Sequence, residues 1–165
     1  MNLNNEFLTA KAEAENGDAN AQAKLGWMYE YGCGVEKDYL EAAKCYQKAA
    51  KQGDVGAQST LGAMYASGVG LEKDPAEALK WLRKAADQDD DMAQNSLGWM
   101  YRNGEGVEED YVEAYAWFNL AATDATTTLA EFSRDDLEKE MSPQQVGEAQ
   151  KRTRELRALI EAKKK

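Results

Sequence analysis

Carboxylates are the side chains of this sequence most able to do chemistry, and the densest group of them lies near the middle of the chain. It consists of Asp87, Asp89, Asp90 and Asp91. Carboxylate oxygens in such clusters are ligands that Ca²⁺ prefers. A helix–loop–helix calcium site also needs a glycine at loop position six and a glutamate at position twelve, where this chain has Gly98. The cluster therefore favours capping of a helix, and no metal site is predicted.

Histidine is absent from the chain, and this excludes the common catalytic arrangements that need an imidazole. Ser-His-Asp and Cys-His sites use it as a base, and many zinc sites use it as a ligand. Two cysteines, Cys33 and Cys45, cannot complete a four-thiolate site, and we expect both to be free thiols. We therefore predict no catalytic residues, no metal, no cofactor and no enzymatic activity.

Other carboxylates recur at a fixed interval, and this interval indicates how the chain is organised. The pair Asp38 and Glu41 appears twice more at the same place in a longer repeat. The repeat returns every 36 residues without insertion, over 21–50, 57–86 and 93–122. A fixed period of roughly 20–50 residues is typical of stacked-repeat proteins. A pair that recurs in this way is better explained as the start of a helix than as an acid–base pair.

The first half of each copy predicts a helix that begins at an aspartate N-cap, which in the first copy is Asp18. Its apolar stripe has helical spacing, at Ala21, Leu25, Met28 and Tyr29. A glycine in the middle of this helix recurs in every copy, so we predict that a neighbouring helix passes too close there for a side chain. A Gly-x-Gly sequence then ends the helix as a tight turn. It lacks the Gly-Lys-Ser/Thr sequence of a phosphate-binding loop.

The second half of each copy predicts another helix, which begins at the repeated aspartate–glutamate pair in a capping box. At the position of Cys45 in the first copy, the later copies have the tryptophans Trp81 and Trp117. Helices of this length are marginal alone in water, so their stability must come from stacking on neighbours. The buried face in the first copy is expected to contain Ala42, Cys45, Tyr46, Ala49 and Ala50.

The three copies share the pattern AxxxLGxMYxxGxGVxxDxxEAxxxYxKAA, which resembles the Sel-1-like repeat, a helical-hairpin relative of the tetratricopeptide repeat. The resemblance implies an all-α fold, a right-handed α-solenoid of antiparallel helix pairs closed by a C-terminal helix pair. It also implies a non-catalytic scaffold that binds a protein or peptide segment on the concave face of the solenoid. The first helix of each repeat lines that face. Cysteine-rich relatives are associated with β-lactam binding, so a small-molecule or β-lactam-type binder or enzyme is the alternative. The positions of their paired cysteines hold Ala50 and Ala57 or Gln58 here.

The repeats and their flanks divide a single domain into five consecutive segments. A half-repeat over residues 1–17 contains a helix, Asn5–Asn16, with Phe7, Ala10 and Ala14 on one face. Such a half-repeat covers the exposed end of a solenoid. The three repeats and the C-terminal capping helices are expected over residues 18–53, 54–89, 90–125 and 126–165.

The C-terminal segment predicts two more helices. A new helix is expected to begin at Pro143, behind a capping box at Ser142. We expect the pair to cover the third repeat, and a coiled-coil dimer is the alternative. The predicted apolar stripes are Leu129, Phe132, Leu137 and Met141 in the first helix, and Val146, Ala149, Thr153, Leu156 and Ile160 in the second.

Recognition is expected at positions of the first helices that vary between copies, since the constant positions form the core. Trp27 and Trp99 are the largest of these residues, and we predict a shallow hollow between them, over Ala63, for an apolar side chain. Arg102 and nearby asparagines would hold a carboxylate or backbone carbonyl groups. The alternative is that both tryptophans pack against neighbouring helices. The predicted partner-binding residues are Asn20, Ala23, Trp27, Glu30, Tyr31, Gly56, Ser59, Ala63, Ala66, Ser67, Met92, Asn95, Trp99, Arg102 and Asn103.

The net charge of −10 argues against nucleic acid as a ligand and favours a basic protein partner. The segment from Pro143 is basic instead, with seven lysines and arginines against three glutamates. Self-assembly through this helix, docked on an acidic repeat face, is a further alternative to the expected monomer. No signal peptide or membrane-spanning segment is recognised, which predicts a cytoplasmic protein without membrane insertion.

Overall fold

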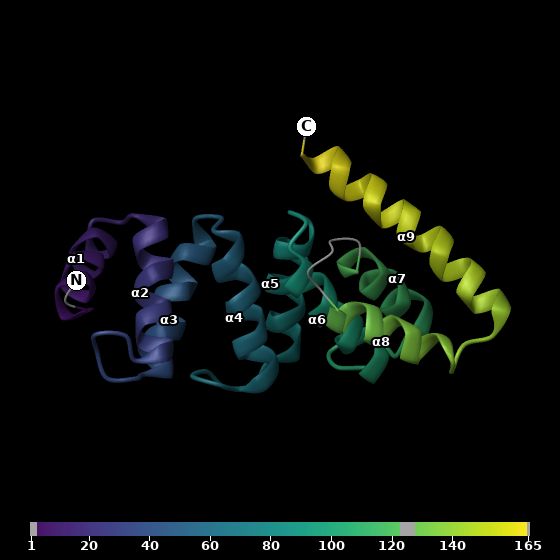
Figure 1. Ribbon diagram of the computed structural model, residues 1–165, viewed down its shortest axis with the longest axis horizontal. Coiled ribbons are helices and arrows are strands. Elements are labelled where there is room, and N and C mark those ends of the chain that lie inside the picture. Colours follow the sequence, from purple (N-terminus) through teal and green to yellow (C-terminus); the bar gives the residue numbers. More distant parts are fainter. Residues whose placement is uncertain (1–2, 123–127, 165) are drawn as a thin grey trace. The chain divides into compact units, whose positions relative to one another are not determined.

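The computed structural model describes residues 3–122 and 128–164, and every regular element in these two ranges is a helix (Figure 1). The all-α class is therefore confirmed. Each sequence repeat supplies one pair of helices, and we call α2, α4 and α6 the A helices and α3, α5 and α7 the B helices. The helices are α1 (Leu3–Glu15), α2 (Ala19–Tyr31), α3 (Tyr39–Lys51), α4 (Val55–Ser67), α5 (Pro75–Ala86), α6 (Asp91–Asn103), α7 (Tyr111–Ala121), α8 (Thr128–Glu138) and α9 (Pro143–Lys163).

The chain forms two compact units, Met1–Trp81 and Leu82–Lys165, and the boundary between them lies inside α5. The first unit contains α1 to α4 with the first part of α5, and the second contains the rest. The right-handed sense of the superhelix and the boundaries of the five segments stay predictions. The predicted boundary between 125 and 126 lies outside the described residues.

The A helices begin and end as predicted. Asp18 accepts a hydrogen bond from the backbone N–H of Ala21 at 2.7 Å, and Asp54 and Asp90 cap α4 and α6 in the same way. Each A helix ends at a glycine with positive φ, such as Gly32 at 72°. This conformation reverses the chain without the strain that a Cβ would cause there.

The B helices begin at the predicted aspartates, but the prediction of a complete capping box is wrong. Asp38 accepts from the N–H groups of Leu40 and Glu41, at 2.9 and 3.0 Å. The backbone N–H of Asp38 donates to the carbonyl of Tyr29 at 2.9 Å, so it is not available to Glu41, whose carboxylate pairs with Lys44 at 2.6 Å. Among the helices described, the reciprocal box forms at α9, where the backbone N–H of Ser142 donates to the side-chain oxygen of Gln145 at 2.9 Å.

A glutamine near the start of each A helix ties it to the element before it. Gln22 donates from its side chain to the backbone carbonyl of Ala14 in α1, and Gln58 donates to the carbonyl of Ala50 in α3, both at 3.2 Å. In the third repeat Gln94 donates to the Asp89 carboxylate at 3.1 Å. These glutamines are buried, so their amides need the bonds.

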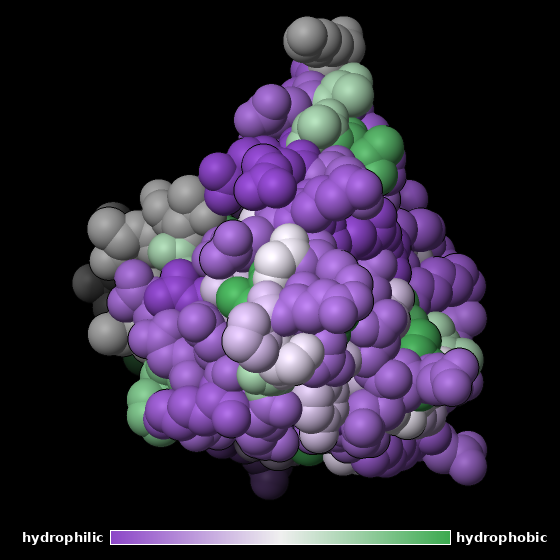
Figure 2. All heavy atoms as spheres, turned by 90° about the vertical axis from the view of Figure 1, so that its right-hand side faces the viewer, coloured by the Kyte–Doolittle hydropathy of each residue, from purple (hydrophilic) through white to green (hydrophobic). Residues whose placement is uncertain are grey.

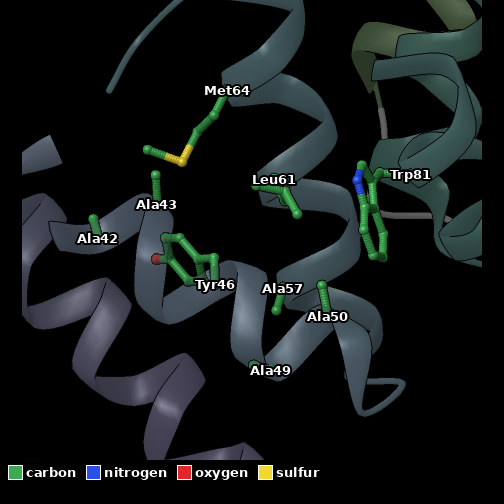
Figure 3. Packing of buried hydrophobic residues seen from close by; sticks show 9 residues of the cluster. All are labelled: Ala42, Ala43, Tyr46, Ala49, Ala50, Ala57, Leu61, Met64 and Trp81. Carbon is green, nitrogen blue, oxygen red and sulfur yellow. The ribbon is translucent and has the colours of Figure 1, made fainter. Parts of the chain in front are cut away.

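The core of the first unit is built from small residues of the B helix and larger ones of its neighbours. Figure 3 shows Tyr46 of α3 and Leu61 of α4 in one cluster with Trp81 of α5. The mid-helix glycine of α2 lies against the Tyr46 ring, which would be 3.0 Å from a Cβ added at Gly26. The predicted close approach of a neighbouring helix is therefore confirmed here.

The core of the second unit forms where α8 and α9 pack against α7. Trp117 and Phe118 of α7 are fully buried, and Gly98 of α6 is the close-approach glycine, with the Phe118 ring 2.5 Å from an added Cβ. On α9 the predicted stripe is confirmed: Val146 is partly buried, and Ala149, Thr153, Leu156 and Ile160 are buried.

The predicted apolar stripe of α8 is wrong for two of its four residues. Leu129 and Phe132 are exposed, by 59% and 69%, whereas Leu137 and Met141 are buried. The buried face of α8 is completed by Ala130 and Ser133. Ser133 tolerates burial because its hydroxyl donates to the carbonyl of Leu129 at 2.9 Å, and small residues let the helix approach its neighbours closely.

The basic helix α9 docks on acidic residues of its own chain. Lys163 pairs with Asp87 at 2.5 Å and Lys164 with Asp89 at 2.6 Å. The Lys164 ammonium lowers the pKa of the Asp89 carboxyl. The aspartate cluster is thus used for ion pairs and for the α6 cap. The face shown in Figure 2 is mostly hydrophilic.

The two cysteines are free, as predicted, and we expect them to differ in reactivity. Cys33 is half-buried in the turn after α2, whereas Cys45 is buried on α3, and burial raises the pKa of the Cys45 thiol. Because the thiolate is the reactive form, a thiol reagent should label native Cys33 first. Labelling of Cys45 should become appreciable only above the pH at which an ordinary cysteine ionises. Mass spectrometry of labelled peptides checks this, and equal Cys45 rates in native and urea-unfolded protein would contradict it.

Candidate partner-binding face

The A helix of the first unit carries an exposed aromatic pair. Trp27 is 48% exposed and Tyr31, one turn later on α2, is 58% exposed. Their ring centroids lie 5.4 Å apart, with the ring planes tilted by 37°. Residues four apart share one face of a helix, so the two rings form one continuous apolar surface that solvent reaches. Asn20 is exposed on the same helix, and Ala23 is partly buried against the core.

Glu30 has a structural partner within the first unit. Its carboxylate accepts a hydrogen bond from the Tyr46 hydroxyl of α3 at 2.7 Å. Burial and this carboxylate raise the pKa of the Tyr46 hydroxyl, so the phenol stays protonated as the donor. Glu30 therefore joins α2 to α3, besides its place among the predicted partner-binding residues.

The A helix α4 presents only small side chains at the predicted positions. Ala63 and Ser67 are exposed, Ala66 is partly buried, and Gly56 at the start of the helix is exposed. The Ser67 hydroxyl donates to the carbonyl of Ala63 at 2.8 Å. Ser59 is buried, so its side chain does not reach this surface.

In the second unit, the exposed surface of α6 is built around Trp99, which is 37% exposed. Its ring meets the buried Phe118 ring edge to face, with centroids 5.6 Å apart. Met92, at the start of the helix, and Asn103, at its end, are exposed. The predicted hollow between Trp27 and Trp99 joins residues of two different compact units and stays a prediction.

Arg102 of α6 already has carboxylate partners in the same unit. Its guanidinium pairs with Asp136 at 3.1 Å and with Glu140 at 2.6 Å, and it lies 5.3 Å above the Trp99 ring. A partner carboxylate would have to displace these two acidic groups, which the sequence did not indicate. Asn95 is partly buried, and its side-chain oxygen has no hydrogen-bond partner among the described residues.

Two residues of α8, Leu129 and Phe132, continue the exposed face and were assigned to the core by sequence reasoning. They stand at the same spacing from buried Ala130 as Met92 and Asn95 do from buried Ala93. The helix α8 thus repeats the pattern of an A helix, although it lacks the LGxMY sequence. Aligning Ala130 of α8 with Ala93 of α6 would have revealed this pattern.

The tryptophans of the A and B helices differ in exposure. Tyr46, Trp81 and Trp117 of the B helices are buried, whereas Trp27, Tyr31 and Trp99 of the A helices are exposed. A large exposed aromatic surface on a regular helix face is a frequent property of protein-binding sites. We call the exposed residues of α2, α4, α6 and α8 the A face, and describe it unit by unit.

The sequence profile of the Sel1 repeat matches residues 19–54, 55–90 and 91–124. This chain belongs to the Sel1 repeat family. Proteins built from Sel1 repeats generally act in protein–protein interaction and are typically non-catalytic scaffolds. The helices α1, α8 and α9 lie outside the matched segments.

Solved structures of similar proteins share the Sel1-type solenoid fold. The crystal structure of c5321, a protective antigen present in uropathogenic Escherichia coli strains and displaying an SLR fold, matches with a TM-score of 0.84 and 37% identity, over 91% of this chain and 32% of that chain. A Sel1 repeat protein from Oxalobacter formigenes matches with a TM-score of 0.61 and 40% identity, over 64% of this chain and 42% of that chain.

A curated relative, DAP3-binding cell death enhancer 1 of Rattus norvegicus, is 51% identical over 37 residues, which is 22% of this chain and 7% of the relative. This Sel1 repeat chain spans less than half the length of each of the three proteins. Among its described helices, none combines the length and the apolar character needed to cross a membrane.

Proposed function

We propose that this chain is a non-catalytic scaffold that binds a segment of a protein partner on its A face. The observation that carries the proposal is the exposure of Trp27, Tyr31 and Trp99 on A helices, in a chain that buries both tryptophans of its B helices. Burying such rings against a partner supplies much of the free energy of binding at protein interfaces. The rat relative is named for the protein that it binds, which agrees with this kind of function.

The chemistry of the partner segment follows from the residues of the A face. The rings of Trp27 and Tyr31 suit an apolar side chain, and the small residues of α4 leave room for a backbone to approach. Carboxylates stand near the face in both units, at Glu30 and at Asp136. With the net charge of −10, they favour a partner segment that carries basic residues beside its apolar anchors.

The test is recovery of partners from the native cell by the immobilised chain. Partner recovery by Trp27→Ala and by Trp99→Ala should fall about tenfold or more, because truncation of such an anchor costs about 2 kcal/mol or more. Recovery should also fall as salt is raised, since screened charges attract a basic segment less. Quantitative mass spectrometry of the recovered proteins measures both effects.

The matched control is Tyr39→Ala, which removes an exposed aromatic ring at the start of the B helix α3. It should leave partner recovery unchanged. Thermal unfolding of each variant reports whether the fold is intact. Tryptophan variants that keep their partners and only melt at a lower temperature would show that these rings stabilise the fold, and would refute the proposal.

A further inference from the structure

The second unit contains a cavity of about 280 Å³ that shares no residue with the A face. Its volume lies at the lower end of small-molecule sites, which are about 300–1,000 Å³, so it suits a ligand no larger than an amino acid with a small substituent. One side is apolar, because α9 contributes leucine and isoleucine. The lining residues are Arg83 and Asp87 of the α5 end, Trp117 of α7, and Arg152, Leu156, Leu159, Ile160 and Lys163 of α9.

Trp117, which lines this cavity, is a fully buried tryptophan whose indole N–H has no acceptor among the described residues. In the second repeat the equivalent tryptophan has a hydrogen-bond acceptor for its indole N–H. There Trp81 donates from Nε1 to the carboxylate of Glu77, one turn earlier, at 3.1 Å. Glu113 holds the equivalent place before Trp117, but its Oε1 accepts instead from Arg152 of α9 at 2.7 Å.

Docking of α9 therefore separates a hydrogen-bonding pair that the second repeat keeps together. The Oε2 atom of Glu113 is also buried without a partner. Buried donors and acceptors without partners are rare in native proteins, because each has lost its hydration without replacement. The third repeat thus contains a buried indole N–H and a buried carboxylate oxygen whose hydrogen bonds are not made among the described residues.

Arg83 is the second notable group of the cavity, because no described carboxylate of its unit pairs with its guanidinium. Its guanidinium lies over the Trp117 ring, 5.0 Å from the centroid, and donates to the Tyr101 hydroxyl at 2.6 Å. The other cations of the cavity have carboxylate partners, Arg152 in Glu113 and Lys163 in Asp87. Within residues 82–122 and 128–164, no carboxylate forms an ion pair with Arg83.

We propose that this cavity binds a carboxylate that carries an apolar group of the size of an amino-acid side chain. The carboxylate pairs with Arg83 next to the Trp117 indole, and the apolar group packs on Leu156, Leu159 and Ile160. A charge-assisted bond to a guanidinium is stronger than a neutral hydrogen bond, so it fixes the position of the ligand. Two sources offer this chemistry, the C-terminus of a peptide that ends in leucine and a free acyl amino acid.

The experiment is a titration of the full chain, followed by the indole N–H signals in two-dimensional ¹⁵N–¹H NMR. The chain has four tryptophans, so each indole signal can be assigned with a Trp→Phe variant. The probes are N-acetyl-leucine, a hexapeptide that ends in a free leucine carboxylate, and the same hexapeptide with an amidated C-terminus. We expect a saturable shift of the Trp117 signal with one or both acids, and an unchanged signal from Trp81, which already has its acceptor.

Variants of the chain test whether Arg83 binds the acid, and the amidated hexapeptide tests whether the ligand's carboxylate is needed. Arg83→Gln should weaken binding of the acid at least tenfold, whereas Arg154→Gln, which removes an exposed positive charge of α9 outside the cavity, should not. Response to only one acid identifies the source of the ligand. Absence of a saturable shift with both acids, equal binding of the amidated peptide, or unchanged binding by folded Arg83→Gln would overturn the proposal. None of these results bears on partner recovery through the A face.

Discussion

Ending the chain at Met141, which removes α9, is expected to leave the second unit unfolded or aggregated. The deletion uncovers the surface of α7 on which Leu156 and Ile160 are now buried. Each such side chain contributes about 1.5–3 kcal/mol on burial, and a domain of ordinary stability has only about 5–15 kcal/mol in total. Thermal unfolding followed by circular dichroism, together with light scattering, measures the outcome.

A chain that ends at Ala162 is the matched control for this deletion. It lacks Lys163 and Lys164, and with them the ion pairs to Asp87 and Asp89, but it keeps the apolar face of α9. Exposed ion pairs contribute less than about 1 kcal/mol each, so this chain should stay folded and monomeric. A soluble monomer with an unchanged melting temperature after the longer deletion would contradict a capping role for α9.

Gly98→Ala is expected to lower the free energy of unfolding by about 1–3 kcal/mol, although alanine is the better helix former. The added methyl group would stand 2.5 Å from the ring of Phe118, which is itself fully buried and cannot turn away. The A helix and the B helix of the third repeat would have to move apart. Urea unfolding of the variant and the wild type, followed by circular dichroism, measures the difference.

Gly147→Ala is the control for this substitution. No atom lies within 4 Å of a Cβ at Gly147, a position in the interior of α9, so alanine there should raise the free energy of unfolding by about 0.5–1 kcal/mol. Gly26→Ala should fall between the two, because the Tyr46 ring is 3.0 Å from the added Cβ, a smaller overlap than the 2.5 Å at Gly98. Equal effects at Gly98 and Gly147 would show that the close approach does not constrain the third repeat.

Much of the fold could be predicted because the repeat supplies the same local information three times. The caps at Asp18, Asp54 and Asp90 rest on bonds between residues three apart, which a sequence displays directly. The close-approach glycines were also predictable, since a mid-helix glycine is unfavourable unless a neighbour requires it. Outside the repeat no second copy exists for comparison, and there the orientation of α8 was misassigned.

Prediction failed where a residue chooses between partners far apart in the sequence. The capping-box pattern indicates that Glu113 accepts from the N–H of Asp110, but that N–H donates to the carbonyl of Tyr101, and Glu113 accepts from Arg152 of α9. In the same way, Arg102 finds its carboxylates on and just after α8. Leu129 and Phe132 look like core residues because they are apolar, and only the packing of Ala130 and Ser133 places them on the outside.

The glutamines at the starts of the A helices bear on how such a chain changes its length. Gln22 and Gln58 both bond to a main-chain carbonyl of the preceding element, a group that every residue possesses. The glutamine of a duplicated repeat could therefore donate to a backbone carbonyl of whichever repeat precedes it, and no new side chain would be required. Gln94, which bonds to Asp89 instead, shows that the attachment also survives a local substitution. Natural selection is then free to alter the recognition positions of each copy while the number of copies grows or shrinks.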